Sequence, residues 1–272
     1  MTLLVGVLCS NGVVIAADRQ ATHGAMGQAT VGQSVTKVQV INNEALYATS
    51  GHKGLGQQLC AVVEGKQPEF KNQRYDANII KVQQALRPLV DGALTTAGLA
   101  ARVIGNAAAA PDSICGGLLA AGFKDGLKLV EITHQVAVEY MTKDMPFISM
   151  GSGKPSADLF LGFLRKIYWP TELPTIQEGA LAAYWTIQHA IEMKVTGVGF
   201  SVDVFTVEPS DKTYVARKLD DAEVAEHVDF IKAAEEALRA VRDSLTAAPA
   251  AQTPATTPPT LSQSKVTHRV LK

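Results

Sequence analysis

Aromatic and charged residues are both scarce in this sequence of 272 residues, and each scarcity excludes a class of protein. Aromatic residues make up only 6%, which disfavours a surface that stacks on nucleic-acid bases. Charged residues make up 19%, too few for a disordered or coiled-coil protein. Lys and Arg number 25 against 26 for Asp and Glu, so a net charge of -1 gives no electrostatic reason to expect a nucleic acid or an anionic membrane as a partner.

Cysteine and long apolar runs are scarce as well. Cys9, Cys60 and Cys115 are far apart and form no CxxC or Cys/His spacing, so we interpret them as buried thiols in a reducing compartment rather than as metal ligands. The histidines are scattered, with no HExxH, and no metal or cofactor site is predicted. The apolar run at residues 3–9 has no preceding basic residue, so it is not a signal peptide, and no run of about 18 apolar residues could span a bilayer. We expect a cytoplasmic protein.

Apolar residues are plentiful at 47%, enough to build a full core. Hairpins are predicted where apolar strand-like runs flank short turns, and helices where the apolar period changes. The expected strands are 3–9, 13–17, 37–41, 45–49, 114–123, 127–133, 136–141, 146–150, 200–208 and 213–217, with a polar loop between Asp18 and Lys37. The expected helices are 51–65, 77–96, 155–167, 175–194 and one that runs from an N-cap at Asp220, with Glu223 at the capping-box position, to about Ser244. Such alternation favours antiparallel sheets covered by helix layers.

The end of the chain differs in composition. Residues 246–264 consist mainly of Ala, Pro, Thr, Gln and Ser, which bury too little apolar surface to offset chain entropy. We therefore predict a domain over residues 2–244 and a disordered tail over residues 245–272. The basic, apolar end at residues 265–272 is either a solvated terminus or a docking peptide.

Two short motifs bear on chemistry. Gly151-Ser152-Gly153-Lys154 is not a nucleotide-binding P-loop, because Ile148 stands where that loop needs glycine and Pro155 follows the lysine. Met1 precedes Thr2, and initiator methionine is normally removed before so small a residue. Removal would leave one threonine with both a nucleophilic hydroxyl and an α-amino base, whose pKa of roughly 7.7 to 8.0 suits proton transfer at cellular pH.

A set of dispersed elements resembles the proteasome β-subunit and HslV peptidase family. They are Thr2, Gly12, the segment from Asp18 to Gly24, Lys37, Ser50-Gly51 and Gly151-Ser152-Gly153. Their order and spacing match that family over residues 2 to about 217, and the nearest resemblance is to bacterial proteasome homologues outside the actinobacterial and HslV types. The resemblance implies an α+β fold, the four-layer αββα sandwich of N-terminal nucleophile (Ntn) hydrolases.

The resemblance also implies roles for single residues. Thr2 would attack the scissile carbonyl, Lys37 would lower the pKa of the Thr2 amine, and Asp18 would hold Lys37 charged and oriented. The Gly51 N–H would donate to the oxyanion, a contribution of about 3 to 4 kcal/mol. Ser152 would hydrogen-bond near the amine.

Substrate contacts can be assigned by family position. Thr22 would align the substrate through its main chain, while Ala21, Val35, Thr49 and Lys53 would line the primary specificity pocket. Thr49 would form a small floor, and Lys53 would either favour acidic or polar side chains or point to solvent.

Two departures from the family pattern limit the transfer. The loop before Lys37 is about three residues longer than usual, and Met193 stands where proteasomal subunits carry an Asp that supports the amine. HslV-type members also lack that Asp. Glu192 is the alternative carboxylate in this stretch.

The sequence therefore predicts a threonine endopeptidase, a hydrolase that self-assembles into stacked homo-oligomeric rings and cleaves peptides or unfolded polypeptides. The resemblance also allows an ATPase unfoldase as a partner. Two alternatives stay open: a weakly active or inactive ring-forming structural subunit, and a small-molecule amidohydrolase of the Ntn type.

Overall fold

The computed structural model describes residues 2–25, 28–104, 114–211 and 213–247. By contact density the chain divides into two compact units, Met1–Asp229 and Phe230–Lys272. The described part of the second unit is the C-terminal portion of α5 (Asp221–Ala247). The predicted tail lies outside the described residues, except for residues 245–247, which continue α5 beyond the expected end at Ser244.

Two five-stranded antiparallel sheets form the centre of the first unit. One sheet contains, in spatial order, β10 (Phe147–Gly151), β1 (Leu3–Cys9), β2 (Gly12–Asp18), β11 (Val202–Pro209) and β12 (Tyr214–Lys218). The other contains β5 (Val38–Ile41), β6 (Ala45–Gly51), β7 (Cys115–Phe123), β8 (Gly126–Ile132) and β9 (Val138–Tyr140). The predicted hairpins are present, and the turn between β5 and β6 uses positive φ at both Asn42 (49°) and Asn43 (57°).

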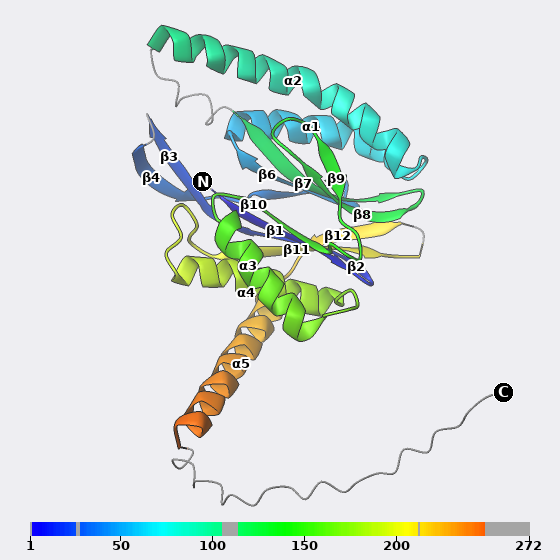
Figure 1. The fold of residues 1–272 in the computed structure, drawn as a ribbon. Coiled ribbons are helices and arrows are strands. Elements are labelled where there is room, and N and C mark those ends of the chain that lie inside the picture. Colours follow the sequence, from blue (N-terminus) through cyan, green and yellow to red (C-terminus); the bar gives the residue numbers. More distant parts are fainter. Residues whose placement is uncertain (1, 26–27, 105–113, 212, 248–272) are drawn as a thin grey trace, which may run out of the picture. The chain divides into compact units, whose positions relative to one another are not determined.

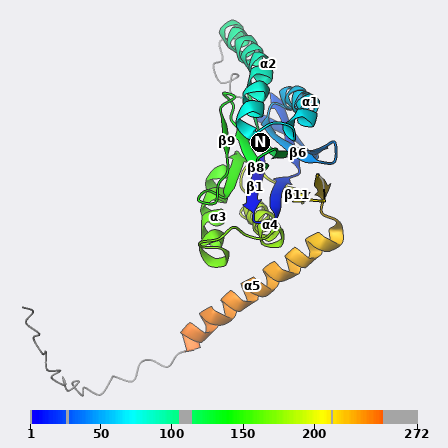
Figure 2. The same ribbon diagram turned by 90° about the vertical axis from the view of Figure 1, so that its right-hand side faces the viewer.

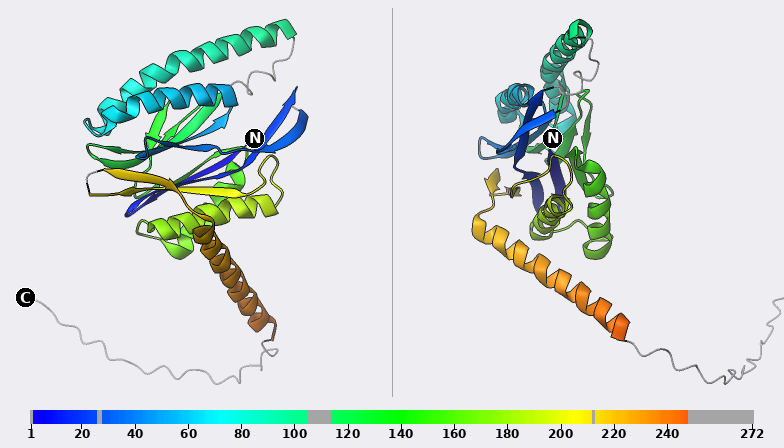
Figure 3. Two further views of the ribbon diagram at one scale, coloured as in Figure 1. Left: turned by 180° about the vertical axis from the view of Figure 1, so that it is seen from behind. Right: turned by 90° about the vertical axis from the view of Figure 1, so that its left-hand side faces the viewer.

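Helices cover the outer faces of both sheets (Figure 1). α1 (Lys53–Phe70) and α2 (Tyr75–Ile104) lie over the second sheet, and α3 (Lys154–Tyr168) and α4 (Ile176–Glu192) lie over the first. The same four layers are visible after a quarter turn (Figure 2) and from behind (Figure 3). The fold is therefore the predicted α+β sandwich, with the layer order αββα.

Apolar side chains fill the space between the layers. One buried cluster joins the two sheets and includes Leu4, Ile15, Leu46, Leu118 and Leu129. A second cluster joins α1 and α2 to the outer face of the second sheet. All three cysteines are free and buried, as predicted.

The polar segment between Asp18 and Lys37 differs from the prediction. Instead of a loop, it forms a two-stranded ribbon of β3 (Gln20–Ala25) and β4 (Gln28–Ser34). The two strands pair with each other through their backbones. The sequence did not predict them, because its small and polar residues lack the alternating apolar side chains that indicate a strand. Among the described residues, no helix is both long and apolar enough to cross a lipid bilayer.

Candidate active site

Thr2 lies immediately before β1, where the ends of β1, β10 and β6 come together. It is 7% exposed. β1 pairs with β10 so that Leu3 faces Gly151, and the Gly153 N–H donates to the Thr2 carbonyl at 3.4 Å. The pairing thus brings the start of the chain against the Gly151–Gly153 turn, although the two are about 150 residues apart in sequence.

Ser152 contacts the Thr2 backbone on both sides of its Cα. The Thr2 N–H donates to Ser152 Oγ at 3.3 Å, and the Ser152 hydroxyl lies 3.3 Å from the Thr2 carbonyl oxygen and 3.4 Å from that of Thr196, either of which can accept its proton. Because Met1 precedes Thr2 in this chain, the Thr2 nitrogen is an amide. After removal of Met1 the same nitrogen would be an amine with Ser152 Oγ beside it.

Asp18 ends β2 and is fully buried, with 0% exposure. Its Oδ1 accepts from the Leu3 N–H at 2.8 Å and from Lys37 Nζ at 2.6 Å. Its Oδ2 accepts from the Gln20 N–H at 3.1 Å and from the Gly199 N–H at 3.2 Å. A buried carboxylate needs such a set of donors, and this set ties four chain segments to one side chain.

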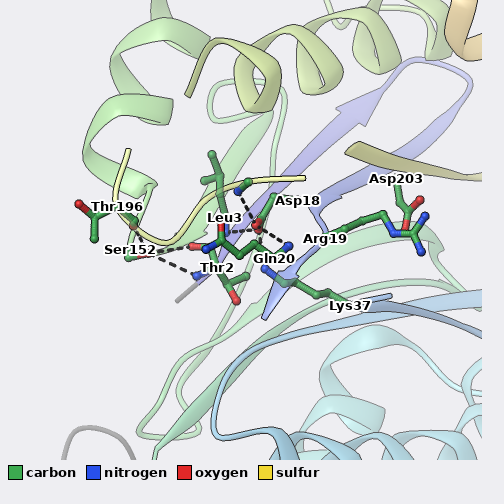
Figure 4. A network of polar contacts seen from close by, with 10 residues as sticks. Thr2, Leu3, Asp18, Arg19, Gln20, Lys37, Ser152, Thr196 and Asp203 are labelled. Atoms are coloured by element: carbon green, nitrogen blue, oxygen red, sulfur yellow. Dashed lines mark hydrogen bonds and ion pairs between the residues drawn. The ribbon is translucent and has the colours of Figure 1, made fainter. Parts of the chain in front are cut away.

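Lys37 precedes β5 and reaches Asp18 with a side chain that is only 6% exposed. Burial lowers the pKa of the Lys37 ammonium, while the charge of Asp18 and its hydrogen bond act in the opposite direction. Because Lys37 and the Leu3 N–H share one Asp18 oxygen, the cation lies beside the first residues of β1. Figure 4 shows Thr2 between Ser152 and Asp18, with Lys37 on the Asp18 side.

Gly51 ends β6 with φ of +118°, a conformation that favours glycine. The next residue, His52, donates its N–H to the Ile114 carbonyl at 3.0 Å. Since N–H groups alternate between the two edges of an antiparallel strand, the Gly51 N–H lies on the other edge, where the Thr49 N–H donates to Lys37 O at 3.4 Å. Ser50 Oγ lies 3.1 Å from the position that a Cβ on Gly151 would occupy, so this end of β6 adjoins the Thr2 turn.

The expected pocket residues lie on the elements around this end of β6. Ala21 and the Thr22 backbone belong to β3, opposite Gln33 and Gly32, and the Thr22 side chain lies outside the described residues. The Val35 N–H donates to Arg19 O at 2.8 Å at the base of the ribbon. Thr49 Oγ1 is close to Gly56 of α1, and Lys53 is exposed at the start of that helix. Their contact with a substrate stays a prediction.

Met193 stands at the position where the resemblance expects a late carboxylate. Met193 is the C-cap of α4 and is 62% exposed. Glu192, the alternative carboxylate in this stretch, accepts from Gln188 of the same helix at 2.8 Å, and its role as a substitute stays a prediction. The group that reaches Ser152 from this segment is the Thr196 carbonyl.

Several positioning groups were not foreseen from the sequence. The Gly199 N–H reaches Asp18 from the segment after α4, with only a Gly in a short turn as a signal. Asp203, whose side chain is 4% exposed, pairs with Lys218 at 2.6 Å and lies 3.7 Å from Arg19 Nε, beside the catalytic candidate Asp18. Within the described residues, no cluster of three or more His, Cys, Asp or Glu side chains could hold a metal ion.

Comparisons with known proteins bear on the fold and on the N-terminal third of the chain. A family model described as "Proteasome subunit" matches residues 2–87. The fold is similar to that of Anbu (ancestral beta-subunit) from Yersinia bercovieri, with a TM-score of 0.62, 17% identity, and coverage of 92% of this chain and 99% of that one. No curated protein matches the chain. At this identity, the structural likeness shows the shared fold.

Proposed function

We propose that this chain, whose family match and fold support a proteasome β-subunit-like family, is a threonine endopeptidase after removal of Met1. One observation carries the proposal: Asp18 Oδ1 accepts from both the Leu3 N–H and Lys37 Nζ, which holds a buried cation beside the threonine that would become the first residue. Lys37 and Asp18 do not form an ordinary surface ion pair, because their side chains are only 6% and 0% exposed.

In the proposed reaction, Thr2 Oγ attacks the carbonyl carbon of the scissile peptide bond. The hydroxyl proton passes to the Thr2 amine, and the carbonyl oxygen becomes an oxyanion. The amine then gives its proton to the leaving nitrogen as the C–N bond breaks, which leaves an ester on Thr2. Water hydrolyses the ester and regenerates the hydroxyl. Thr2 thus supplies both the nucleophile and the group that accepts and returns the proton.

Lys37 and Asp18 would prepare the amine for this role. A buried positive charge beside an amine favours the neutral, proton-accepting form of that amine. Asp18 would keep Lys37 aimed at the site. Ser152 Oγ, at 3.3 Å from the Thr2 nitrogen, would orient the amine and exchange protons with it.

The Gly51 N–H would stabilise the oxyanion. It lies on the edge of β6 that faces β5, but beyond Lys37, the residue that precedes β5. There the Val35 N–H donates to Arg19 O and not to β6. One such donor typically contributes about 3 to 4 kcal/mol to lowering the barrier.

The test compares wild type with Thr2→Ala and Thr2→Ser. We expect Thr2→Ala to abolish peptide cleavage and labelling of the N-terminal residue by a Thr-directed electrophile, while Thr2→Ser keeps both because it retains the hydroxyl. Mass spectrometry of each preparation verifies that Met1 is absent. If processed Thr2→Ala protein cleaves peptides as fast as wild type, the proposed nucleophile is wrong.

The absence of the late carboxylate favours a second candidate, a ring-forming structural subunit with little or no turnover. Met193 carries no carboxylate, and the Glu192 carboxylate accepts from Gln188 of its own helix at 2.8 Å. Processed wild-type protein that assembles but resists the electrophile would support this candidate over the first.

We further propose that the chain assembles into stacked homo-oligomeric rings that enclose the sites, in the cytoplasm, with an ATPase unfoldase as a possible source of unfolded polypeptide. The fold shared with Anbu and the family match support this assembly. Native mass spectrometry tests it, since a monomer with activity on small amides would instead indicate an open amidohydrolase.

A further inference from the structure

The C-terminal part of α5 exposes a regular apolar stripe. Leu238 and Val241 are each 57% exposed, and Leu245 is 74% exposed. With Ala234 one step earlier, these residues are spaced by four, three and four, which places them at alternating d and a positions of a heptad repeat. That spacing makes a narrow seam for one partner helix, rather than the broad face that packs against a sheet.

Charges flank this stripe on one side only. Glu235 and Arg242 follow the two d residues and occupy the e positions, whereas the g positions hold the small residues Ala237 and Ser244. Each charge has a neighbour on its own helix: Glu235 pairs with Arg239 at 3.1 Å, and Arg242 with Asp243 at 2.6 Å. Such exposed pairs are worth less than about 1 kcal/mol and can exchange partners at little cost.

The pattern of charges discriminates between partner orientations. In a parallel pair, e residues face g residues of the other helix, so Arg242 would face Ala237 and no ion pair would form. In an antiparallel pair, e faces e and g faces g. Glu235 of each copy then faces Arg242 of the other, and Ala237 faces Ser244, with Leu238 packed against Val241 and Ala234 against Leu245.

We propose that residues 234–245 of α5 pair in antiparallel fashion with the same residues of a second copy of this chain. The two-fold arrangement forms two Glu235–Arg242 ion pairs between the copies. It also packs the smallest stripe residue, Ala234, against the most exposed one, Leu245. The paired segment is short, about 18 Å at the rise of an α-helix, so it would reinforce other contacts between subunits rather than replace them. The pairing does not require Thr2 to be catalytic.

Charge reversal in the full-length chain tests the pairing. We expect Glu235→Arg and Arg242→Glu each to weaken self-association at least about tenfold in sedimentation velocity, because each places two like-charged pairs in the seam. The double variant should recover association, and so should an equimolar mixture of the two single variants, whose copies complement each other. Circular dichroism checks that helix content is unchanged.

Glu236→Arg is the matched control, since it makes the same charge change on the exposed face away from the stripe and should leave association at the wild-type value. The proposal is overturned if wild type is monomeric, if the single variants associate like wild type, or if neither the double variant nor the mixture recovers. Failure of Thr2→Ala to lose activity would bear on the proposed function and leave this result unaffected.

Discussion

The position of Thr2 depends on backbone groups that carry no catalytic function. Gly151 adopts φ of +102°, and a Cβ added there would overlap the Thr2 carbonyl. The neighbouring Gly153 N–H donates to that carbonyl. The close approach of two backbones, which only glycine permits, therefore fixes the position of Thr2.

Gly151→Ala tests this dependence. We expect peptidase activity to fall at least about 100-fold, since a shift of about 1 Å in a reacting group costs that much. Part of any loss in stability comes from the positive φ alone, about 1 to 2 kcal/mol. Activity is measured at saturating peptide and unfolding in urea.

Gly126→Ala separates the two effects. Gly126 has nearly the same φ, +108°, but nothing lies within 4 Å of a Cβ added there. It should lose similar conformational stability and keep its activity. Equal losses of activity in the two variants would show that Gly151 acts through stability and not through contact with Thr2.

At the residue scale, the sequence was informative where a chemical type was required. Thr2, Asp18, Lys37 and Ser152 were expected together, and they lie together in one contact network. The Gly199 N–H that completes Asp18 could not be predicted, because a backbone donor has no residue-type signature and lies 181 residues away. Their roles in catalysis stay predictions.

At the scale of elements, the sequence predicted helices and strands correctly where residues close together in the chain favour them. The β5–β6 hairpin and the capping box of α5 were predicted because the residues that favour a turn or a cap lie close together in the sequence. In the capping box, Asp220 Oδ1 accepts from the Glu223 N–H at 2.9 Å. The β3–β4 ribbon was missed because its pairing comes from backbone register rather than from an apolar pattern. Likewise, α1 begins at Lys53 with His52 as N-cap, not at Gly51, since Gly51 completes β6.

The corner between β10 and α3 is held by three polar side chains. Ser149 is fully buried and its hydroxyl donates to Asp158 at 2.5 Å. Lys154 contacts Asp158 at 3.0 Å and donates to the Ser149 carbonyl at 3.1 Å. These contacts span the Gly151–Gly153 turn, so they brace the segment that carries Ser152.

We expect Asp158→Ala to lower kcat about tenfold with little change in KM, because Ser152 would move relative to the Thr2 amine while the substrate cleft stays intact. Asp158→Asn, which still accepts from Ser149, should recover part of the loss. Steady-state kinetics of processed protein give both constants.

Lys143→Ala is the control for removal of an ion pair. Lys143 contacts Glu172 at 2.7 Å, but both side chains are more than half exposed and the pair braces no part of the site. Its kinetics should equal those of wild type. If Asp158→Ala also behaves like wild type, the corner does not position Ser152.

At the scale of the whole first unit, the two sheets are joined by close packing of side chains from one sheet against glycines of the other. Tyr214 of β12 packs on Gly122 of β7, where an added Cβ would overlap the tyrosine ring. Leu129 of β8 similarly lies 3.0 Å from a Cβ placed on Gly6 of β1. The sequence indicated two sheets and an apolar core, but such contacts depend on how the sheets cross, which no local pattern encodes.

Gly122→Ala should therefore destabilise the unit by about 2 kcal/mol, a typical cost of overpacking, because the added methyl displaces the Tyr214 ring. The free energy of unfolding is measured by urea denaturation. In a Tyr214→Ala background the same Gly122→Ala change should cost almost nothing, since the ring it meets is gone. A double-mutant cycle on the two positions isolates this contact between sheets.

Gly65→Ala in α1 provides the opposite case. Gly65 is exposed within the helix and nothing lies within 4 Å of a Cβ added there, so alanine should stabilise the protein by about 0.5 to 1 kcal/mol through helix propensity alone.

If Gly122→Ala costs the same with and without Tyr214, the cost comes from strand conformation. The ring would then not be the contact that holds the sheets in register.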